Sequence, residues 1–110
     1  MILKRPSIYL YVNQPHPKLL REICSGIEEE GIFFEIISRE STDLATLTYE
    51  AANHSMLGSG IGILADTTAF QIKGLALGNY IFHYENPSKE ESRRLGSNSA
   101  RALKKLPFRE

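Results

Sequence analysis

Residues 7–31, "SIYLYVNQPHPKLLREICSGIEEEG", predict a strand followed directly by a helix. Residues 7–12 are β-branched and aromatic and form a short run, which is typical of a buried strand. The segment "NQPHP" interrupts that strand, and residues 17–30 then place apolar side chains at the spacing of one buried helical stripe. These side chains are Leu19, Leu20, Ile23, Cys24 and Ile27. Because a helix that follows a strand favours parallel pairing with the next strand, this stretch indicates an α/β fold.

The same alternation continues along the chain. Residues 33–37, "FFEII", predict a second strand, and residues 60–65, "GIGILA", predict a third. Between them we expect a helix whose N-terminus is capped by a hydroxyl or carboxylate side chain. The candidate caps are Ser41, Thr42 and Asp43, and the inward positions of this helix are Leu44, Leu47 and Ala51.

The C-terminal half is less regular. Residues 67–68 predict a turn or short helix, residues 70–72 a strand, and residues 80–84 a further strand. The last helix is expected to begin after Ser88, which forms a capping-box pattern with Glu91 three positions later. We expect it to extend to about residue 106. Its inward positions are Leu95, Ser99, Ala102, Leu103 and Leu106.

Together these elements predict one domain, residues 1–110, with three α/β/α layers and a mostly parallel sheet of about five strands. The composition, 42% hydrophobic and 24% charged, is that of a globular protein. The 13 basic and 13 acidic residues cancel, which argues against nucleic acid or an acidic membrane as the partner. No run approaches the roughly 20 apolar residues of a membrane span, and no secretory signal is recognisable. We therefore expect a cytoplasmic protein whose single cysteine, Cys24, is buried.

Residue types that serve in catalytic and metal sites are present, but their spacing does not match such sites. The glycines of "GSGIG" (58–62) precede a strand, whereas phosphate-binding loops follow one, so a tight turn is favoured. His16, His54 and His83 show no metal-ligand spacing with one another. Asp66, at the end of a predicted strand, is interpreted as a helix cap. The sequence thus predicts no catalytic residues and no cofactor bound by this chain alone.

Small residues occur within the last predicted helix. The segment "GSNS" (96–99) includes a glycine, which costs a helix about 1 kcal/mol relative to alanine. Such residues let another backbone approach closely. The contact is either with this protein's own sheet or with another subunit, and in the second case Arg93, Arg94 and Arg101 supply polar contacts.

Three motifs resemble the small subunit of the diol/glycerol dehydratase reactivating factor: "GIEEEGI" (26–32), "GSGIGI" (58–63) and "LGSNSARALKKLPFRE" (95–110). The resemblance covers residues 7–110 in the same order. It implies a non-catalytic subunit in an α2β2 complex with a large subunit, which carries an actin/Hsp70-like ATPase core and binds ATP. In that family the complex releases damaged cobalamin from its client, an adenosylcobalamin-dependent dehydratase. The choice between glycerol and propane-1,2-diol, and an association with a bacterial microcompartment, stay open.

The medium (β) subunit of the dehydratase itself is the alternative, because the resemblance implies the same fold for it. In that family the chain is longer, with extensions at its ends, so length favours the reactivase subunit. Phe33 is a departure, because the resemblance leads us to expect proline there. A third interpretation, a free-standing ligand-binding α/β domain, requires a pocket that the sequence does not indicate.

Glu28, Glu29 and Glu30 end the first predicted helix, where the helix dipole disfavours acidic side chains. At 100° per residue from Ile27, they lie at about 100°, 200° and 300°, so Glu29 points directly away from the core. The resemblance implies that Glu29 completes a magnesium or calcium site on the large subunit, across the interface. The other expected interface residues are Glu28, Glu30, Arg94, Gly96, Asn98 and Arg101.

Overall fold

The computed structural model describes residues 6–109, within which lie five strands and three helices. In chain order they are β1 (Ile8–Asn13), α1 (Pro17–Glu29), β2 (Phe34–Ser38), α2 (Leu44–His54), β3 (Ser59–Leu64), β4 (Thr67–Ile72), β5 (Phe82–Glu85) and α3 (Lys89–Lys104). Across these residues, no helix combines the length and hydropathy needed to cross a bilayer.

The strands form one sheet in the order β2-β1-β3-β4-β5. Strand β1 pairs in parallel with both β2 and β3, as expected where helices connect successive strands. Strand β4 pairs antiparallel with β3 and with β5. The expected α/β domain with five strands is confirmed, but the sheet is mixed rather than mostly parallel.

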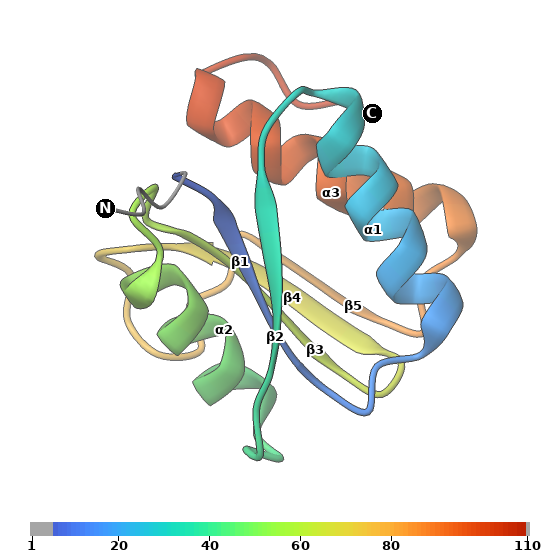
Figure 1. Ribbon diagram of the computed structural model, residues 1–110, viewed down its shortest axis with the longest axis vertical. Coiled ribbons are helices and arrows are strands. Elements are labelled where there is room, and N and C mark those ends of the chain that lie inside the picture. Colours follow the sequence, from blue (N-terminus) through green and yellow to red (C-terminus); the bar gives the residue numbers. More distant parts are fainter. Residues whose placement is uncertain (1–5, 110) are drawn as a thin grey trace, which may run out of the picture.

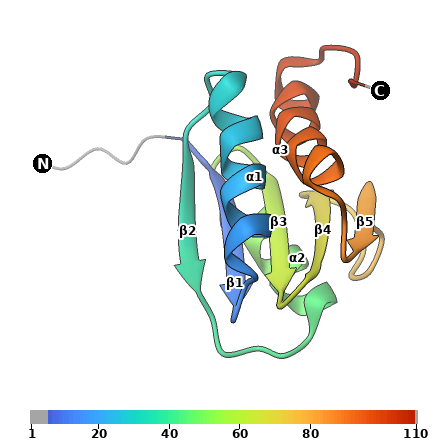
Figure 2. The same cartoon turned by 90° about the vertical axis from the view of Figure 1, so that its right-hand side faces the viewer.

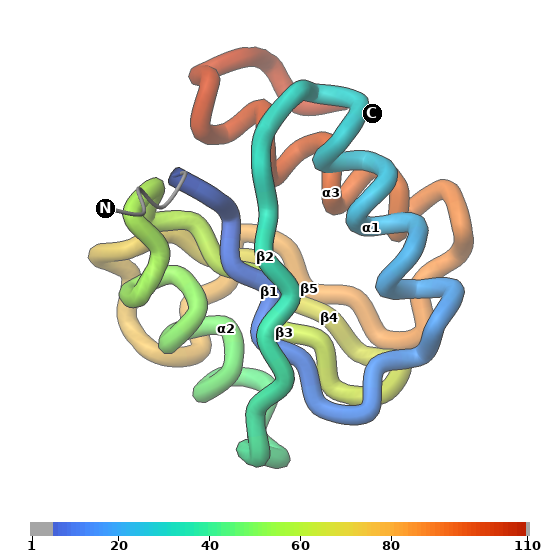
Figure 3. The backbone as a smooth tube through the Cα atoms, viewed as in Figure 1, coloured from blue at the N-terminus to red at the C-terminus, as the bar shows by residue number. Residues whose placement is uncertain are grey.

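The helices cover both faces of the sheet, which confirms the three layers. Figures 1 and 2 show α1 and α3 together on one face and α2 on the other. The larger core cluster lies beneath α1 and α3 and includes Leu10, Ile61 and Phe70, all fully buried. A smaller cluster beneath α2 contains Tyr11, Leu47 and Ala51. The tube in Figure 3 also shows α1 and α3 side by side, although most of the chain separates them.

Helix α2 lies directly on β3 because two glycines face it. A Cβ atom added to Gly60 would overlap the backbone nitrogen of Ala52, and one added to Gly62 would overlap the hydroxyl of Thr48. Gly58, with φ of +68°, makes the turn that leads into β3. The glycines of this segment are therefore explained by a turn and by close packing, as the sequence predicted.

Helices α1 and α3 also touch through their backbones. A Cβ atom added to Gly96 would overlap the carbonyl oxygen of Ile23, and one added to Gly26 would overlap that of Arg93. The close approach expected at Gly96 is thus made with α1 of the same chain and not with the sheet. This contact holds the C-terminal half of α1 against the middle of α3.

Local helix signals agree with the structure. The carboxylate of Asp43 caps α2 by accepting a hydrogen bond from the backbone of Thr46 at 3.3 Å. Ser88 and Glu91 form the predicted capping box at the start of α3. Cys24 is buried, as expected.

The region after β3 differs from the prediction. Residues 65–66 form a tight turn with φ of +54° at Ala65, so β3 and β4 make a hairpin, and the interpretation of Asp66 as a helix cap is wrong. Residues 67–68 are strand and not helix, in line with the β preference of two consecutive threonines. Helix α3 ends at Lys104, and Leu106 is 42% exposed instead of facing inward.

Candidate functional site

The acidic residues at positions 28–30 lie where α1 ends. Glu29 is the last helical residue and Glu30 is the C-terminal cap. The helix stops there because Gly31 adopts a left-handed conformation, with φ of +74°. Because α1 and α3 lie side by side, this end of α1 meets basic residues of α3.

Glu29 is bound by two arginines from the same chain. Its Oε1 accepts a hydrogen bond from Nη1 of Arg93 on α3, and its Oε2 accepts one from Nη1 of Arg109 at 3.1 Å. The hydrogen bond from Arg93 is the main reason why the pKa of Glu29 lies below its usual value, and Arg109 adds to this. The Glu29 side chain is still 38% exposed. It is therefore an ionised, solvent-accessible carboxylate, as a cation ligand requires.

Glu30 is held more firmly than Glu29. Its Oε2 accepts hydrogen bonds from the Ser97 hydroxyl at 2.8 Å and from Arg101 Nε at 3.1 Å, and Lys104 Nζ lies 3.6 Å from Oε1. The hydrogen bond from Ser97 is the main cause of a pKa below the usual value. The side chain is only 10% exposed, so Glu30 connects α1 to α3 within this chain.

Glu28, by contrast, lies on the exposed side of α1. Of the three acidic residues it is the one whose side chain forms no hydrogen bond or ion pair within the described part of the chain. It remains available to a partner, as does the exposed face of Glu29.

Asn98 holds the segment that follows α3. Its amide nitrogen donates to the carbonyl oxygen of Arg109 at 3.2 Å, and the backbone N–H of Arg109 donates to its Oδ1 at 2.7 Å. Arg101 Nη1 donates to the carbonyl oxygen of Pro107 at 3.1 Å. Asn98 is 5% exposed. Two residues expected at a subunit interface thus already bind the chain's own C-terminal residues.

Arg94 lines a basic hollow beside the same helices. The hollow has a volume of about 490 Å³. Its lining residues are Glu22, Lys89, Glu90, Arg93, Arg94 and Arg109. Glu22 forms an ion pair with Arg93, and its Oε1 lies 2.7 Å from Nη2 of the guanidinium. No ion pair of Arg94 occurs within residues 6–109, so this cation is open to an acidic group from outside.

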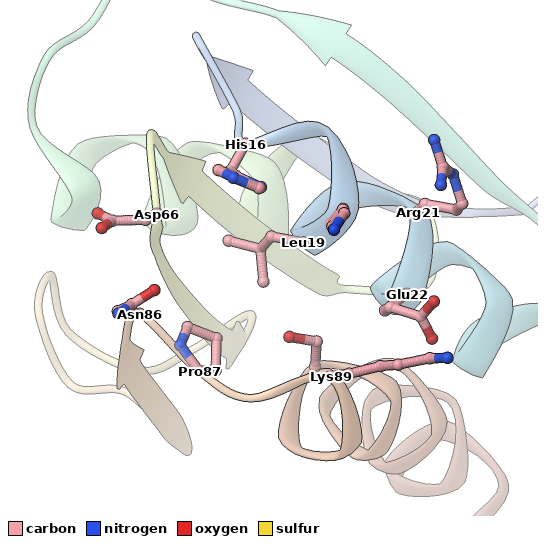
Figure 4. A pocket seen from close by; sticks show the side chains of 10 residues that line it. His16, Leu19, Arg21, Glu22, Asp66, Asn86, Pro87 and Lys89 are labelled. Atoms are coloured by element: carbon pink, nitrogen blue, oxygen red, sulfur yellow. The ribbon is translucent and has the colours of Figure 1, made fainter.

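A second pocket, of about 400 Å³, lies where the loops after β1 and β5 meet the hairpin turn. The backbone N–H of His16 donates to the carbonyl oxygen of Ala65 at 2.8 Å and joins two of these segments. Figure 4 shows His16, Asn86 and Pro87 around Leu19. The pocket required by a ligand-binding interpretation therefore exists. Its charged lining residues carry both signs, namely Lys18, Arg21, Glu22, Asp66 and Lys89.

The histidines do not converge on a common site. His54 forms a hydrogen bond with the hydroxyl of Tyr11, the two atoms being 2.6 Å apart. His83 lies exposed on β5 with its ring 5.1 Å from that of Tyr80, and His16 lines the second pocket. Within residues 6–109, no three histidine, cysteine or acidic side chains lie close enough together to hold a metal ion.

The arginine partners of Glu29 were not predicted from the sequence. The helical wheel considered α1 alone, and it could not show that α3 runs beside the face on which Glu29 lies. One signal was present, because Arg93, Ser97 and Arg101 are spaced four residues apart and therefore share one face of α3. The spacing of residues could not indicate the contact of Arg109 with Glu29, because Arg109 lies beyond the end of α3.

Comparison with known protein sequences gives matches along nearly the whole chain. The family model described as "Dehydratase medium subunit" matches residues 5–109. The propanediol dehydratase-reactivating factor small subunit of Citrobacter freundii is 33% identical over 109 residues, which are 98% of this chain and 94% of that protein. Its counterpart in Salmonella typhimurium is 31% identical, with 96% and 91% covered.

Solved structures agree with this result. A chain of the diol dehydratase-reactivating factor complexed with ADP and Mg²⁺ has a TM-score of 0.90 at 30% identity, covering 97% of this chain and 100% of that one. A glycerol dehydratase reactivase chain has a TM-score of 0.90 at 29% identity, covering 96% and 98%. The names of these relatives favour the reactivase interpretation over a dehydratase subunit. By sequence and by fold, the chain belongs to the dehydratase medium subunit family.

Proposed function

We propose that this chain is the small subunit of a reactivating factor for adenosylcobalamin-dependent diol or glycerol dehydratase. The observation that carries the proposal is the end-to-end match to reactivating factor small subunits, with 94% of one relative covered at 33% identity. The fold supports it as well, since a reactivating factor chain is covered completely at a TM-score of 0.90.

In this role the chain binds a large subunit, and the large subunit binds and hydrolyses ATP. The ADP and Mg²⁺ in the related factor support a nucleotide-dependent complex. We further propose an α2β2 assembly in the cytoplasm, in or near a microcompartment. There the small subunit takes the place of the dehydratase's medium subunit, so that damaged cobalamin is released. Among the expected interface residues, Glu28 and Arg94 have charged side chains without an ion pair in residues 6–109, so that a partner could contact them.

The test is to purify this chain with an affinity tag from its native host. A large ATPase subunit should accompany it, and the isolated chain should neither hydrolyse ATP nor bind cobalamin. Recovery of a dehydratase large subunit with bound cobalamin would instead support the second candidate, the medium subunit of the dehydratase. The family description is the observation that keeps this candidate open.

We also propose that Glu29 supplies one ligand to a magnesium or calcium ion at the interface with the large subunit. A hard cation prefers carboxylate oxygens, and Glu29 is ionised and 38% exposed. One carboxylate alone cannot hold such an ion, so the remaining ligands must come from the partner. The two guanidinium groups oppose this role, because each oxygen of Glu29 already accepts a hydrogen bond from Arg93 or Arg109 and their positive charges repel a cation. Cation binding is therefore favoured when at least one arginine moves away from the carboxylate.

This role is tested by measuring the affinity between the subunits for the Glu29→Gln variant, with and without Mg²⁺. The substitution keeps the shape of the side chain and removes its charge, so binding should weaken and a chelator should have less further effect. Glu28→Gln is the matched control for metal dependence, because it removes a neighbouring charge that lies outside the arginine contacts. Any loss of affinity that it causes should be the same with and without Mg²⁺. Unchanged affinity and unchanged metal dependence in Glu29→Gln would exclude the role.

A further inference from the structure

The C-terminal segment, residues 105–109, folds back against the ends of α1 and α3. Lys105 reverses the chain, because its left-handed conformation, with φ of +57°, ends α3. Beyond it, Asn98 forms two hydrogen bonds with the backbone of Arg109, and Arg101 binds the carbonyl oxygen of Pro107. The ring of Phe108 lies 5.1 Å from that of Phe82 on β5. These contacts place the segment in one position on the surface.

This position brings Arg109 onto Glu29. Nη1 of Arg109 is 3.1 Å from Oε2 of Glu29 and 3.5 Å from the Ser97 hydroxyl. Because Arg93 already binds Oε1, the arrival of Arg109 occupies the second oxygen of the carboxylate. Arg93 is part of a regular helix, whereas Arg109 lies in a segment without helix or strand structure. Arg93 is also held by the carboxylate of Glu22, 2.7 Å away, so Arg109 is the arginine that is more easily displaced from Glu29.

The segment is held by polar contacts and little apolar burial. Phe108 is 46% exposed and Leu106 is 42% exposed. Exposed segments with few buried apolar contacts open at low free-energy cost. The closed arrangement can therefore exchange with an open one while α1, α3 and the sheet stay folded.

We infer that the C-terminal segment is an autoinhibitory latch, in which Arg109 places a positive charge on the Glu29 carboxylate that a cation at the subunit interface would bind. This inference rests on the proposed function of Glu29. The cation and the guanidinium carry the same sign and compete for one carboxylate, so each lowers the apparent affinity of the other. The apparent affinity for the large subunit is reduced by the fraction of molecules whose latch is closed. Binding of the large subunit, in turn, releases the segment.

The experiment measures the affinity between this chain and the large subunit in Mg²⁺ for wild type, Arg109→Gln and Lys105→Gln. Arg109→Gln removes the competing charge, and exposed ion pairs are weak, so binding should tighten by about two- to fivefold. Lys105→Gln is the matched control, because it removes a charge from the same segment and Lys105 takes part in no ion pair within residues 6–109. Its affinity should equal that of wild type. Thermal unfolding of both variants checks that they are folded.

Hydrogen exchange in the wild-type complex supplies a second readout that needs no variant. The backbone N–H of Arg109, which Asn98 protects in the free chain, should exchange faster once the large subunit is bound. Protection that persists in the complex, or an Arg109→Gln variant that binds no tighter than wild type, would overturn the latch and leave the proposed function intact. If wild type fails to bind an ATPase large subunit, the proposed function itself is wrong and the latch with it.

Discussion

Replacing Gly96 by alanine tests whether α1 and α3 touch through their backbones. The added Cβ atom would overlap the carbonyl oxygen of Ile23 and would lie 2.9 Å from its carbonyl carbon and 3.1 Å from the nitrogen of Ile27. Backbone atoms cannot rotate away as a side chain can, so the helices must move apart. Overpacking of this kind costs about 1–3 kcal/mol.

The helix propensity of alanine offsets part of this cost. Alanine is favoured over glycine within a helix by about 1 kcal/mol. Because the overlap is with a backbone oxygen, we place the cost at the upper end of the range and expect a net loss of about 1–2 kcal/mol. For a domain of this size that corresponds to a fall in the unfolding temperature of about 4–8 °C. Thermal and urea unfolding followed by circular dichroism measure it.

Two further variants make the result specific. Ser25→Ala, on α1, is the control, and it should change stability by less than about 0.5 kcal/mol. Gly26→Ala is the reciprocal change, because its Cβ would overlap the carbonyl oxygen of Arg93. The double variant should lose less than the sum of the two single losses, since the first substitution already separates the helices.

A Gly96→Ala variant as stable as wild type, or more stable, would show that the helices do not touch at this position, because the gain in helix propensity would then act alone. The loss should be equal in the isolated chain and in its complex with a large subunit, since the contact lies within this chain. A loss confined to the complex would mean that Gly96 packs against the partner instead.

Two other predictions concern ionisable groups. Burial, with a smaller contribution from the Glu28 carboxylate, raises the pKa of the Cys24 thiol to about 12. A thiol reagent at pH 8 should therefore react with Cys24 only as fast as the chain unfolds, and rapid labelling of the native protein would contradict this. The hydrogen bond from Ser97 is the main reason why the pKa of Glu30 is lowered in the folded protein. The contribution of the ionised Glu30 to stability is therefore complete above the ordinary carboxyl pKa of about 4.3, and it is lost as the pH falls through the lower folded-state pKa. Unfolding temperatures measured from pH 7 to pH 3 should therefore fall less steeply for Glu30→Gln than for wild type, and parallel curves would exclude this role of Glu30.

The sequence alone determined the elements whose signals are local. The strand at β1 and the apolar stripe of α1 follow from the spacing of side chains within one element. The caps at Asp43 and Ser88 follow from side chains that bond to their own helix within three residues. The three-layer arrangement then follows, because each apolar face must be covered.

Tertiary structure decided which elements meet. Strands β3 and β4 form a hairpin because a two-residue turn at 65–66 reverses the chain, and nothing in the strand residues themselves specifies that direction. The environment of Glu29 has the same origin, since its partners Arg93 and Arg109 lie 64 and 80 positions away. The wheel placed Glu29 on the outside of α1, but only the packing of Gly26 and Gly96 brings α3 close enough for those arginines to reach it. A local pattern shows which face of a helix is polar, whereas the charge that meets that face depends on the packing of the whole chain.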